Sequence, residues 1–467
     1  MPLNEPTPEF LSKLASITDS ATPAARYLEE PRGRYEGQGV AVVRPRSVNK
    51  VSEIVRLCNT HKVGVVPYGG GTGLVGGQTS IAGPKPVILS LERLNSIRDV
   101  DPADNILTAE AGVILADIQN AADDVQRLFP LSLASEGSCQ IGGNLATNAG
   151  GVNVLRYGNT RDLCLGIEAV LPDGSIFGGL KRLRKDNTGY NLRNLLIGAE
   201  GTLGIITAAT LRLMPKPVEV ETAFLAIPNP QAGVEILSRL STQLGEVTSA
   251  FELIHRQGLE FLNETGIEFT EPLPSNPEWM VLLECGAGGD SGLKDNLERI
   301  LGDAFDAGLI ADAVLAQNEA QRQAFWNIRE HIPVANRRIG VISSHDISVP
   351  VSQVPDFIKR TAQMVKSINP KFRINCFGHL GDGNLHYNIY PPKGAKRAEF
   401  DGIRASLARN VYELVDGFGG SFSAEHGIGR MKKADLLKYS DPAKLTAMRA
   451  IKSALDPNGI MNPGAVI

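Results

Sequence analysis

Histidines set in glycine-rich turns are the first candidates for chemistry in this 467-residue chain. His379 and His386 lie on either side of a turn between two β-type runs within residues 377–388. The two imidazoles can therefore face each other across a hairpin, which is a suitable geometry for metal ligands. Glu425 and His426 form a third candidate group, and adjacent side chains point in different directions if the backbone is extended. Two neutral imidazoles and a carboxylate with open positions suit a catalytic Zn²⁺ or a similar divalent ion.

A glycine-rich loop at residues 67–78 indicates a second kind of chemistry, the binding of phosphate. It contains a literal G-x-G-x-x-G at Gly71, Gly73 and Gly76. A dinucleotide-binding fingerprint of this type needs a helix directly after it, whereas further glycines and prolines interrupt the following segment, so we reject NAD. What remains is a run of backbone N–H groups without β-carbons, which can fold as an anion nest around a pyrophosphate. A flexible surface loop is the alternative for this segment taken alone.

Two more glycine-rich loops repeat the pattern. Residues 134–152 interleave glycines with hydroxyl and amide side chains, and residues 197–206 lead into an alternating strand that ends at Leu213. A structural turn rarely needs so many glycines and hydrogen-bond donors. Three such loops from separated positions can converge on one large cofactor that carries a polyphosphate.

The elements that must position these loops are of mixed type. Apolar periodicity in the N-terminal half predicts an α+β domain whose glycine loops cluster at strand ends. The expected elements are a helix over Ser47–His61, strands over Val63–Val66, Val87–Leu91 and Ile106–Ala111, a helix over Leu115–Val125, and a hairpin around residues 172–174.

The pattern changes around residues 214–217, where we place a domain boundary. Strands and helices alternate from there to about residue 415, which predicts a sheet covered by helices on one side. The expected strands are Thr222–Ile227, Thr248–Ile254, Trp279–Cys285, Ile310–Leu315, Ile342–Val349, Phe372–Phe377 and His386–Tyr390. The expected helices are Gln231–Thr242, Leu293–Asp306, Glu319–Glu330, Val354–Ile368 and Arg397–Val415, with a last helix that begins after Asp441.

Composition excludes several classes of function. The formal charge of -4 leaves no basic field for nucleic acid or an anionic membrane, and no apolar run is long enough to span a bilayer. The five cysteines are scattered without a C-x-x-C pair, which argues against a disulfide framework and a thiolate zinc site. A reducing compartment fits best, and without a recognisable targeting segment we expect a cytoplasmic location.

The three glycine loops, in this order and at this spacing, resemble the FAD-binding domain of the vanillyl-alcohol oxidase (PCMH-type) flavoproteins. The C-terminal half resembles their D-2-hydroxy-acid dehydrogenase branch, which includes D-2-hydroxyglutarate and D-lactate dehydrogenases. The resemblance begins at about residue 35 and implies four segments. These are an N-terminal helical extension (1–34), the FAD-binding domain (35–216), a substrate or cap domain with an antiparallel sheet covered by helices (217–425), and a C-terminal segment (426–467) that returns to the FAD site.

The resemblance also implies which residues bind FAD. They are Pro67, Gly69, Gly70, Gly71, Thr72, Gly73, Gln78, Ser135, Gly137, Gly142, Gly143, Asn148, Gly151, Glu200, Gly201, Ile206 and Asn462. Some relatives attach the flavin covalently through a histidine or cysteine in these loops. The first loop has neither, and Cys139 is the only sulfur in the second, so we expect noncovalent FAD.

For the metal, the resemblance implies the ligands His379, His386 and Glu425 and the catalytic base His426, with Zn²⁺ or Mn²⁺ as the ion. The chemistry is consistent with these roles. A metal that binds both the hydroxyl and the carboxylate of a 2-hydroxy acid polarises the O–H bond and orients the Cα–H bond towards the flavin. His426 then takes the hydroxyl proton as hydride leaves for flavin N5.

Substrate recognition is implied for two residues, Arg329 for a carboxylate and Asn388 as a further contact. A solvated helix arginine is the alternative for Arg329. The chain departs from the hydroxyglutarate-specific pattern at Pro333, where that pattern has threonine, and at Ser344, where it has lysine. The arginines at 337–338 are close enough in sequence to replace that lysine. D-Lactate and D-malate therefore stay open beside D-2-hydroxyglutarate, the first candidate substrate.

The sequence thus predicts an FAD- and divalent-metal-dependent dehydrogenase that oxidises a D-2-hydroxy acid to the 2-oxo acid. An electron-transfer flavoprotein, a quinone or a cytochrome would each serve as its electron acceptor, and the resemblance allows a homodimer. A hypothesis of another class is a zinc hydrolase without flavin, which predicts colourless protein. A third is a noncatalytic flavin-binding subunit, which would usually lack the complete set of His, His and Glu-His residues.

Overall fold

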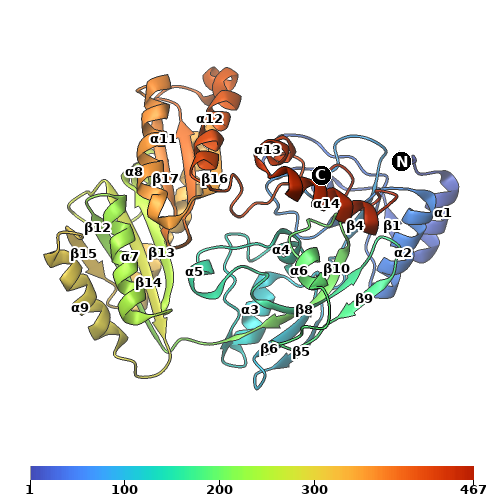
Figure 1. Cartoon of the computed structure of the whole chain (residues 1–467), viewed down its shortest axis with the longest axis horizontal. Coiled ribbons are helices and arrows are strands. Elements are labelled where there is room, and N and C mark those ends of the chain that lie inside the picture. Colours follow the sequence, from blue (N-terminus) through green and yellow to red (C-terminus); the bar gives the residue numbers. More distant parts are fainter. Residues whose placement is uncertain (1) are drawn as a thin grey trace. The chain divides into compact units, whose positions relative to one another are not determined.

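The computed structural model describes residues 2–467, which form two compact units. Unit 1 comprises the residues up to Gly150 together with Gly158–Lys216 and Glu425–Ile467, and unit 2 comprises Gly151–Tyr157 and Pro217–Ala424 (Figure 1). The C-terminal segment therefore belongs to the same unit as most of the N-terminal half. Within residues 2–467, no helix has both the length and the apolar character that crossing a membrane requires.

The first sheet of unit 1 carries the first glycine loop at the end of one strand. Its order is β1-β2-β4-β3, with β2, β4 and β3 parallel. The strands are β1 (Ser20–Ala21), β2 (Ala41–Val43), β3 (Val65–Tyr68) and β4 (Val87–Ser90), and the nearby helices are α1 (Pro8–Ile17), η1 (Ala25–Tyr27) and α2 (Val48–His61). Apolar residues of α1 and α2 pack on this sheet in one core that includes Phe10, Leu14 and Ile54. Because the first loop follows β3 directly, this core positions it.

The second sheet of unit 1 is antiparallel and carries the third glycine loop before its central strand. Its order is β5-β6-β10-β8-β9. The strands are β5 (Ile97–Asp101), β6 (Ile106–Glu110), β8 (Cys164–Val170), β9 (Ile176–Gly179) and β10 (Ile205–Arg212), and a separate pair is formed by β7 (Arg127–Leu128) and β11 (Met214–Pro215). The remaining helices of unit 1 are α3 (Leu115–Asp123), α4 (Ile141–Thr147), α6 (Leu192–Leu196), α13 (Lys433–Tyr439) and α14 (Pro442–Leu455).

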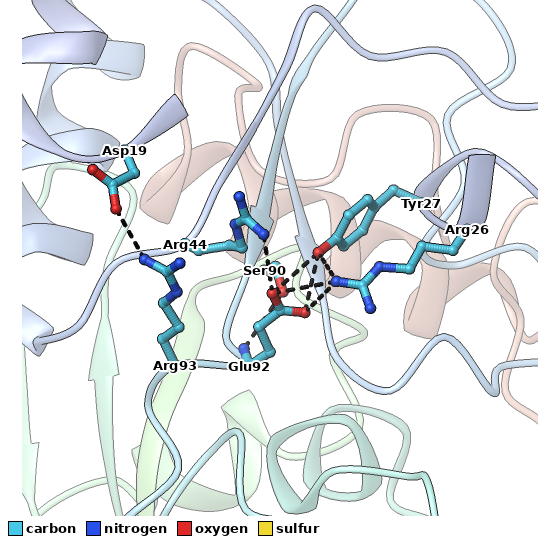
Figure 2. Close-up of polar contacts among 7 residues, drawn as sticks. All are labelled: Asp19, Arg26, Tyr27, Arg44, Ser90, Glu92 and Arg93. Atoms are coloured by element: carbon cyan, nitrogen blue, oxygen red, sulfur yellow. Dashed lines mark hydrogen bonds and ion pairs between the residues drawn. The ribbon is translucent and has the colours of Figure 1, made fainter. Parts of the chain in front are cut away.

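A polar cluster surrounds Glu92 (Figure 2), and it fixes the start of the first glycine loop. The Glu92 carboxylate receives the guanidinium of Arg26 at 3.0 Å, the hydroxyl of Tyr27 at 3.0 Å and, more distantly, Arg44 at 3.7 Å. Tyr68 joins this cluster, because its hydroxyl donates to the backbone oxygen of Arg26 at 2.7 Å and its ring meets Tyr27 edge to face. Tyr68 is the last residue before the glycines, so the cluster holds the point at which the loop begins.

Unit 2 is built on one seven-stranded antiparallel sheet of order β15-β12-β14-β13-β17-β18-β16 (Figure 1). The strands are β12 (Glu219–Ile227), β13 (Thr248–His255), β14 (Trp279–Ala287), β15 (Asp312–Leu315), β16 (Ser343–Ser348), β17 (Arg373–His379) and β18 (Asn384–Tyr390). The helices are α5 (Val154–Tyr157), α7 (Pro230–Leu244), α8 (Arg256–Glu264), α9 (Leu293–Asp306), α10 (Glu319–Ile339), η2 (Val351–Gln353), α11 (Val354–Ile368), η3 (Leu380–Asp382), η4 (Arg397–Ile403) and α12 (Arg404–Gly417).

Helices cover both faces of this sheet, so the prediction of helices on one side is wrong. On one face, Phe224, Ile254 and Phe377 pack against apolar residues of α8 and α10 in a single core. On the other face, α7 lies close enough that a β-carbon at Gly233 would contact Val281, and Phe357 of α11 meets the ring of Tyr387. The strands are apolar in both alternating sets of side chains, which is typical of a sheet buried on both faces.

Helix α10 is longer than predicted, because it continues to Ile339 with Pro333 inside it. A proline usually ends a helix, since it lacks the N–H that would bond to the carbonyl four residues earlier. Here that carbonyl belongs to Arg329, and the buried residues Ile332, Ala335 and Asn336 hold the helix against the sheet on both sides of the proline. Tertiary packing thus outweighs the local preference.

Replacing His255 by asparagine should flatten the dependence of stability on pH. His255 caps α8 by accepting the N–H of Gln257, and burial, with a smaller contribution from Lys366, lowers the pKa of its imidazole to about 4. The unfolded chain therefore takes up this proton first. The contribution of neutral His255 to the free energy of unfolding is complete above pH 6.5 and is lost as the pH falls towards 4, by about 2 to 3 kcal/mol at pH 4.5.

Asparagine keeps a capping oxygen but does not titrate. We expect the difference in urea midpoint between pH 7.5 and pH 4.5 to be smaller in His255→Asn than in the native chain. Parallel pH profiles for the two proteins would show that His255 does not carry this effect.

Candidate functional site

Unit 1 contains a cavity of about 890 Å³, open solvent included, that all three glycine-rich loops line. Its size lies within the usual range for small-molecule and cofactor pockets. Most of the residues predicted to bind FAD line it. They are Pro67, Gly69, Gly70, Gly71, Thr72, Gly73, Gln78, Gly142, Gly143, Glu200, Gly201, Ile206 and Asn462.

Four residues with the same predicted role do not line this cavity. Ser135 is half-buried and Gly137 is exposed, both in the second loop. Asn148 ends α4 in the left-handed conformation, and its side chain accepts the N–H of Arg161 at 2.9 Å, which fixes the turn after the helix. Gly151 belongs to unit 2.

Close backbone contact explains why the first loop needs glycine. A β-carbon at Gly70 would lie 2.2 Å from the carbonyl oxygen of Ser138 and 2.9 Å from Cα of Cys139. Both are backbone atoms of the second loop and have little freedom to move. The first and second loops therefore pack directly together, with the cavity beside them.

The lining of the cavity fits FAD. The side-chain oxygens of Gln140 and Asn144 are buried there without a hydrogen-bond partner in residues 2–467, although buried polar atoms are normally paired. A β-carbon at Gly143 would meet no atom within 4 Å, so the backbone there borders open space. Unpaired acceptors beside an uncovered glycine backbone are what a cofactor rich in hydrogen-bonding groups would complete. Gln140 and Asn144 were not predicted, and the amide side chains of the second loop were the available signal.

Glu200 of the third loop has a structural partner as well as a place in the cavity lining. Its carboxylate accepts the backbone N–H groups of Ile428 at 2.7 Å and Gly429 at 2.8 Å. Burial raises the pKa of Glu200, and the two backbone hydrogen bonds and the charge of Arg430 oppose that rise. Glu200 thus anchors the chain directly after the predicted base His426.

Arg430 and Asn462 tie the C-terminal segment to the first glycine loop. The Arg430 guanidinium donates to the carbonyls of Gly76 and Gly77 at 2.8 Å and to the side chain of Asn462 at 2.9 Å. The Asn462 amide donates to the carbonyls of Gly77 and Glu200. Arg430 was not predicted, because the glycine-loop carbonyls to which it donates lie more than 350 positions away in sequence and no motif surrounds it.

In unit 2, polar residues from four adjacent strands share one face of the sheet. The register places Glu252 of β13 opposite His379 of β17, and Asp346 of β16 opposite His386 of β18. Phe377 of β17 lies opposite His386, so its side chain is on the same face of the sheet. The rings of His379 and His386 are 5.6 Å apart between centroids. The two predicted histidine ligands are therefore together, as the hairpin interpretation requires.

The turn between the two histidines requires glycine at one position. Gly383 ends the short helix η3 with a φ of +78°, in the left-handed region. A β-carbon there would lie 2.1 Å from the carbonyl oxygen of Val349. This close approach to the loop after β16 sets the spacing between His379 and His386.

A buried carboxylate holds both His379 and Arg329. Glu252 has no exposed surface, and its two oxygens lie 2.6 Å from Nδ1 of His379 and 2.8 Å from Nε of Arg329. The guanidinium of Arg329 also lies over the ring of Phe377 at 4.8 Å. Burial alone would raise the pKa of Glu252, but the charges and hydrogen bonds of His379 and Arg329 lower it to about 2. Glu252 was not predicted from the sequence.

A strip of neutral amides continues the same face. Asn375 lies opposite Asn388 in the register, Asn388 lies opposite Ser344, and the Asn375 amide donates to Asn336 of α10 at 2.9 Å. The side-chain oxygens of Asn375 and Asn388 are buried without a partner in the described chain. Asn388, predicted to contact substrate, is therefore placed on the face that carries the histidines.

The arginines at 337 and 338 do not extend this strip. Both are exposed in the last turn of α10, and Arg338 donates to the backbone oxygen of Thr265. Arg338 is nine residues, or two and a half helical turns, beyond Arg329 and so points to the opposite side of the helix. Ser344 itself is exposed.

Glu425 and His426 begin the last segment of unit 1, at the point where the chain leaves unit 2. The residue before them, Ala424, belongs to unit 2, and its N–H approaches the backbone oxygen of Asp346 at 3.4 Å. On the other side, Glu200 holds Ile428 and Gly429 in unit 1. The Glu-His pair is thus tethered on both sides by backbone hydrogen bonds.

Two family models match separate parts of the chain and together cover most of it. The C-terminal domain of FAD linked oxidases matches residues 216–466, and an FAD binding domain matches residues 40–178. The match to the FAD binding domain contains the first and second glycine loops. The match to the C-terminal domain contains both histidines and the Glu-His pair.

Several curated proteins are similar along most of their length. A protein from Oryza sativa subsp. indica named "Probable D-2-hydroxyglutarate dehydrogenase, mitochondrial" is 38% identical over 93% of this chain and 76% of its own. D-2-hydroxyglutarate dehydrogenase from Xanthomonas citri is 36% identical over 95% of this chain and 94% of its own. The Stutzerimonas stutzeri protein of the same name is 38% identical over 91% of this chain and 90% of its own.

Solved structures with the same fold are more distant in sequence. p-Cresol methylhydroxylase matches 98% of this chain and 96% of its own with a TM-score of 0.75 and 17% identity. Alkyldihydroxyacetonephosphate synthase matches 99% of this chain and 85% of its own with a TM-score of 0.73 and 17% identity. These likenesses support the predicted PCMH-type α+β fold.

Proposed function

Since the chain belongs to the FAD-linked oxidase family and is an FAD-dependent D-2-hydroxy-acid dehydrogenase, we propose that it oxidises D-2-hydroxyglutarate to the 2-oxo acid with a divalent metal ion. The observation that carries this proposal is the polar face of unit 2. There a buried carboxylate holds an arginine and an imidazole next to a second imidazole. A zinc hydrolase would have no use for the cavity that the glycine loops form in unit 1.

His379 and His386 fit a metal ion. The carboxylate of Glu252 contacts Nδ1 of His379, which leaves Nε2 as the nitrogen for a ligand bond. We propose Glu425 as the third ligand, because it directly follows Ala424, whose N–H is directed at β16 of the same sheet. Zn²⁺ or Mn²⁺ bound there would supply a Lewis acid for the hydroxyl and carboxylate oxygens of the substrate.

The protein groups each have a separate task in the proposed reaction. Arg329 binds a substrate carboxylate through its Nη groups, because its Nε is engaged by Glu252. Asn388 contacts the substrate from the neighbouring strand. His426 accepts the hydroxyl proton as the C–H bond breaks. FAD, bound noncovalently in the cavity that the three glycine loops line, would supply the hydride acceptor.

The neutral strip favours a second candidate substrate, D-lactate or D-malate. Beyond Arg329, the amides of this face and the exposed Ser344 are uncharged, and the guanidinium of Arg373 is engaged by the carboxylate of Glu264 at 2.6 Å. A second carboxylate on a five-carbon acid would therefore meet the amides rather than an available positive charge. The binding of the smaller acids D-lactate and D-malate depends less on this region.

Steady-state oxidation of a substrate panel tests the proposal and its alternative. D-2-Hydroxyglutarate, D-malate and D-lactate are compared with an artificial electron acceptor, and the product is identified as the 2-oxo acid. The proposal expects the highest kcat/KM for D-2-hydroxyglutarate. A clear preference for D-lactate or D-malate would replace it by the second candidate, and no turnover of any of these acids would contradict both.

Introducing a lysine at position 344 should improve the use of a second carboxylate. Ser344 is exposed and lies opposite Asn388, so the ammonium of Ser344→Lys can reach the amide strip. A charged hydrogen bond is worth about 1.5 to 3 kcal/mol, so kcat/KM for D-2-hydroxyglutarate should rise roughly 10- to 100-fold. D-Lactate, which lacks that carboxylate, should be unaffected. Ser344→Met is the uncharged control, and equal effects of the two variants would exclude the electrostatic explanation.

A further inference from the structure

The geometry points to an unassigned role for Glu252: we propose that it is a positioning residue that fixes the His379 ring and the Arg329 guanidinium in one arrangement. This inference rests on the proposed function, because it concerns the same site. Glu252 lies in β13, with two apolar residues on either side of it in the strand.

Each carboxylate oxygen of Glu252 contacts a different partner. Oε1 lies 2.6 Å from Nδ1 of His379, and Oε2 lies 2.8 Å from Nε of Arg329. Glu252 and His379 are also opposite each other in the strand register. All three side chains are at least nine-tenths buried, so water does not compete for these contacts. Neither partner can rotate without breaking a charged hydrogen bond.

For His379, the contact selects which nitrogen is available. An ionised carboxylate can only accept, so Nδ1 carries the hydrogen and donates it to Oε1. Nε2 then carries the lone pair that a metal ion needs. A carboxylate behind a histidine ligand fixes the tautomer and the ring orientation, and its loss typically costs 10- to 100-fold in metal affinity.

For Arg329, the contact fixes the plane of the guanidinium. Nε is bound to Oε2 of Glu252, and the ring of Phe377 lies under the group. A planar guanidinium held at Nε and on one face presents its Nη edge in a single direction. Glu252 therefore connects the group that binds the metal to the group that binds the substrate carboxylate.

A purely structural role would look different in the measurements, and the same sheet offers a matched control. Glu284 of β14 also receives an arginine and a ring N–H from α10, namely Arg322 at 3.1 Å and Nε1 of Trp326 at 2.7 Å. Neither of these two partners of Glu284 is a histidine. Glu284→Gln should therefore cost stability in the same way as Glu252→Gln without altering metal or acid binding.

The test uses the purified holoenzyme and its Glu252→Gln, Glu252→Asp and Glu284→Gln variants. Each is equilibrated with a graded series of a chelator that buffers free Zn²⁺ or Mn²⁺, and the bound metal is measured by elemental analysis. Separately, the dissociation constant for 2-oxoglutarate, which cannot reduce flavin, is measured at saturating metal from the change in the flavin spectrum. Neither readout depends on turnover.

Glu252→Gln should lower the metal affinity by roughly 10- to 100-fold and raise the dissociation constant of the acid about tenfold or more. Glu252→Asp keeps the charge but is one methylene shorter, so it should recover part of both losses. Glu284→Gln should match the native chain in both readouts. Metal and acid binding of Glu252→Gln equal to those of the native chain would overturn the inference.

If Glu252→Gln fails to fold, the double variant Glu252→Gln/Arg329→Met removes the buried charge pair together. It should bind metal roughly 10- to 100-fold more weakly than Arg329→Met alone, and equal affinities would overturn the inference. Native protein that takes up no divalent metal would instead refute the proposed metal centre itself. The native sample therefore separates failure of the proposed function from failure of the role of Glu252.

Discussion

Replacing His426 by alanine should slow the reduction of bound flavin by a D-2-hydroxy acid roughly 10²- to 10⁴-fold. In the proposed reaction His426 is the group that takes the hydroxyl proton while the C–H bond breaks. Without it, the proton must leave to water or to a group less suited to accept it. Rapid-mixing measurement of flavin bleaching under anaerobic conditions gives the rate constant directly.

The control for this variant is His331→Ala. His331 is an exposed histidine of α10 whose Nδ1 contacts the backbone oxygen of Asn327, and it has no proposed role in catalysis. His426→Ala should retain bound FAD and metal, since Glu200 still anchors Ile428 and Gly429. A near-native rate of flavin reduction in His426→Ala would remove His426 from the role of base.

Substituting valine for Gly70 should abolish FAD binding. Its β-carbon alone would lie 2.2 Å from the carbonyl oxygen of Ser138, so the first and second loops must separate. Those loops line most of the cavity in unit 1. The purified variant should be colourless and should not regain flavin absorbance after incubation with excess FAD.

Two further glycine variants distinguish loss of the cofactor from loss of the fold. At Gly143 a β-carbon would meet no protein atom within 4 Å, and this residue lines the cavity, so Gly143→Val should fold normally and still lose FAD affinity. Gly137→Ala lies at an exposed, open position outside the cavity lining and should bind FAD like the native chain. Normal FAD binding by Gly143→Val would place the cofactor somewhere else.

Elements with strong periodicity and clear ends were predictable from the sequence. Two helices, Leu293–Asp306 and Val354–Ile368, have the predicted bounds. Strands and helices also alternate along unit 2 in the predicted way. The histidine hairpin was predictable too, because a glycine-rich turn between two β-type runs brings its flanking residues together. In these cases the information is local.

Features that depend on distant partners could not be predicted. Both faces of the sheet in unit 2 are buried, and apolar runs of this kind do not reveal which helix covers which face. Continuation of α10 through Pro333 depends on packing of the residues beyond it. Short helices such as α8, between β13 and β14, were also missed, because nine residues give little periodic signal.

The same limit applies to the site. Glu252 is a single charged residue in a buried strand, and its role depends on two partners that lie 77 and 127 positions away in sequence. An isolated carboxylate in an apolar strand was the only available signal, because such a group is rarely buried unless it is paired. Arg430 gave no such signal.

The most direct test of the central claim is an anaerobic absorbance titration of the purified protein with D-2-hydroxyglutarate, with its L-enantiomer as control and D-malate and D-lactate in parallel. We expect a flavin band that the D-acid bleaches stoichiometrically and the L-acid leaves unchanged. A flavin band that none of the D-2-hydroxy acids bleaches, or a protein that takes up no FAD at all, would contradict the assignment of this chain as an FAD-dependent D-2-hydroxy-acid dehydrogenase.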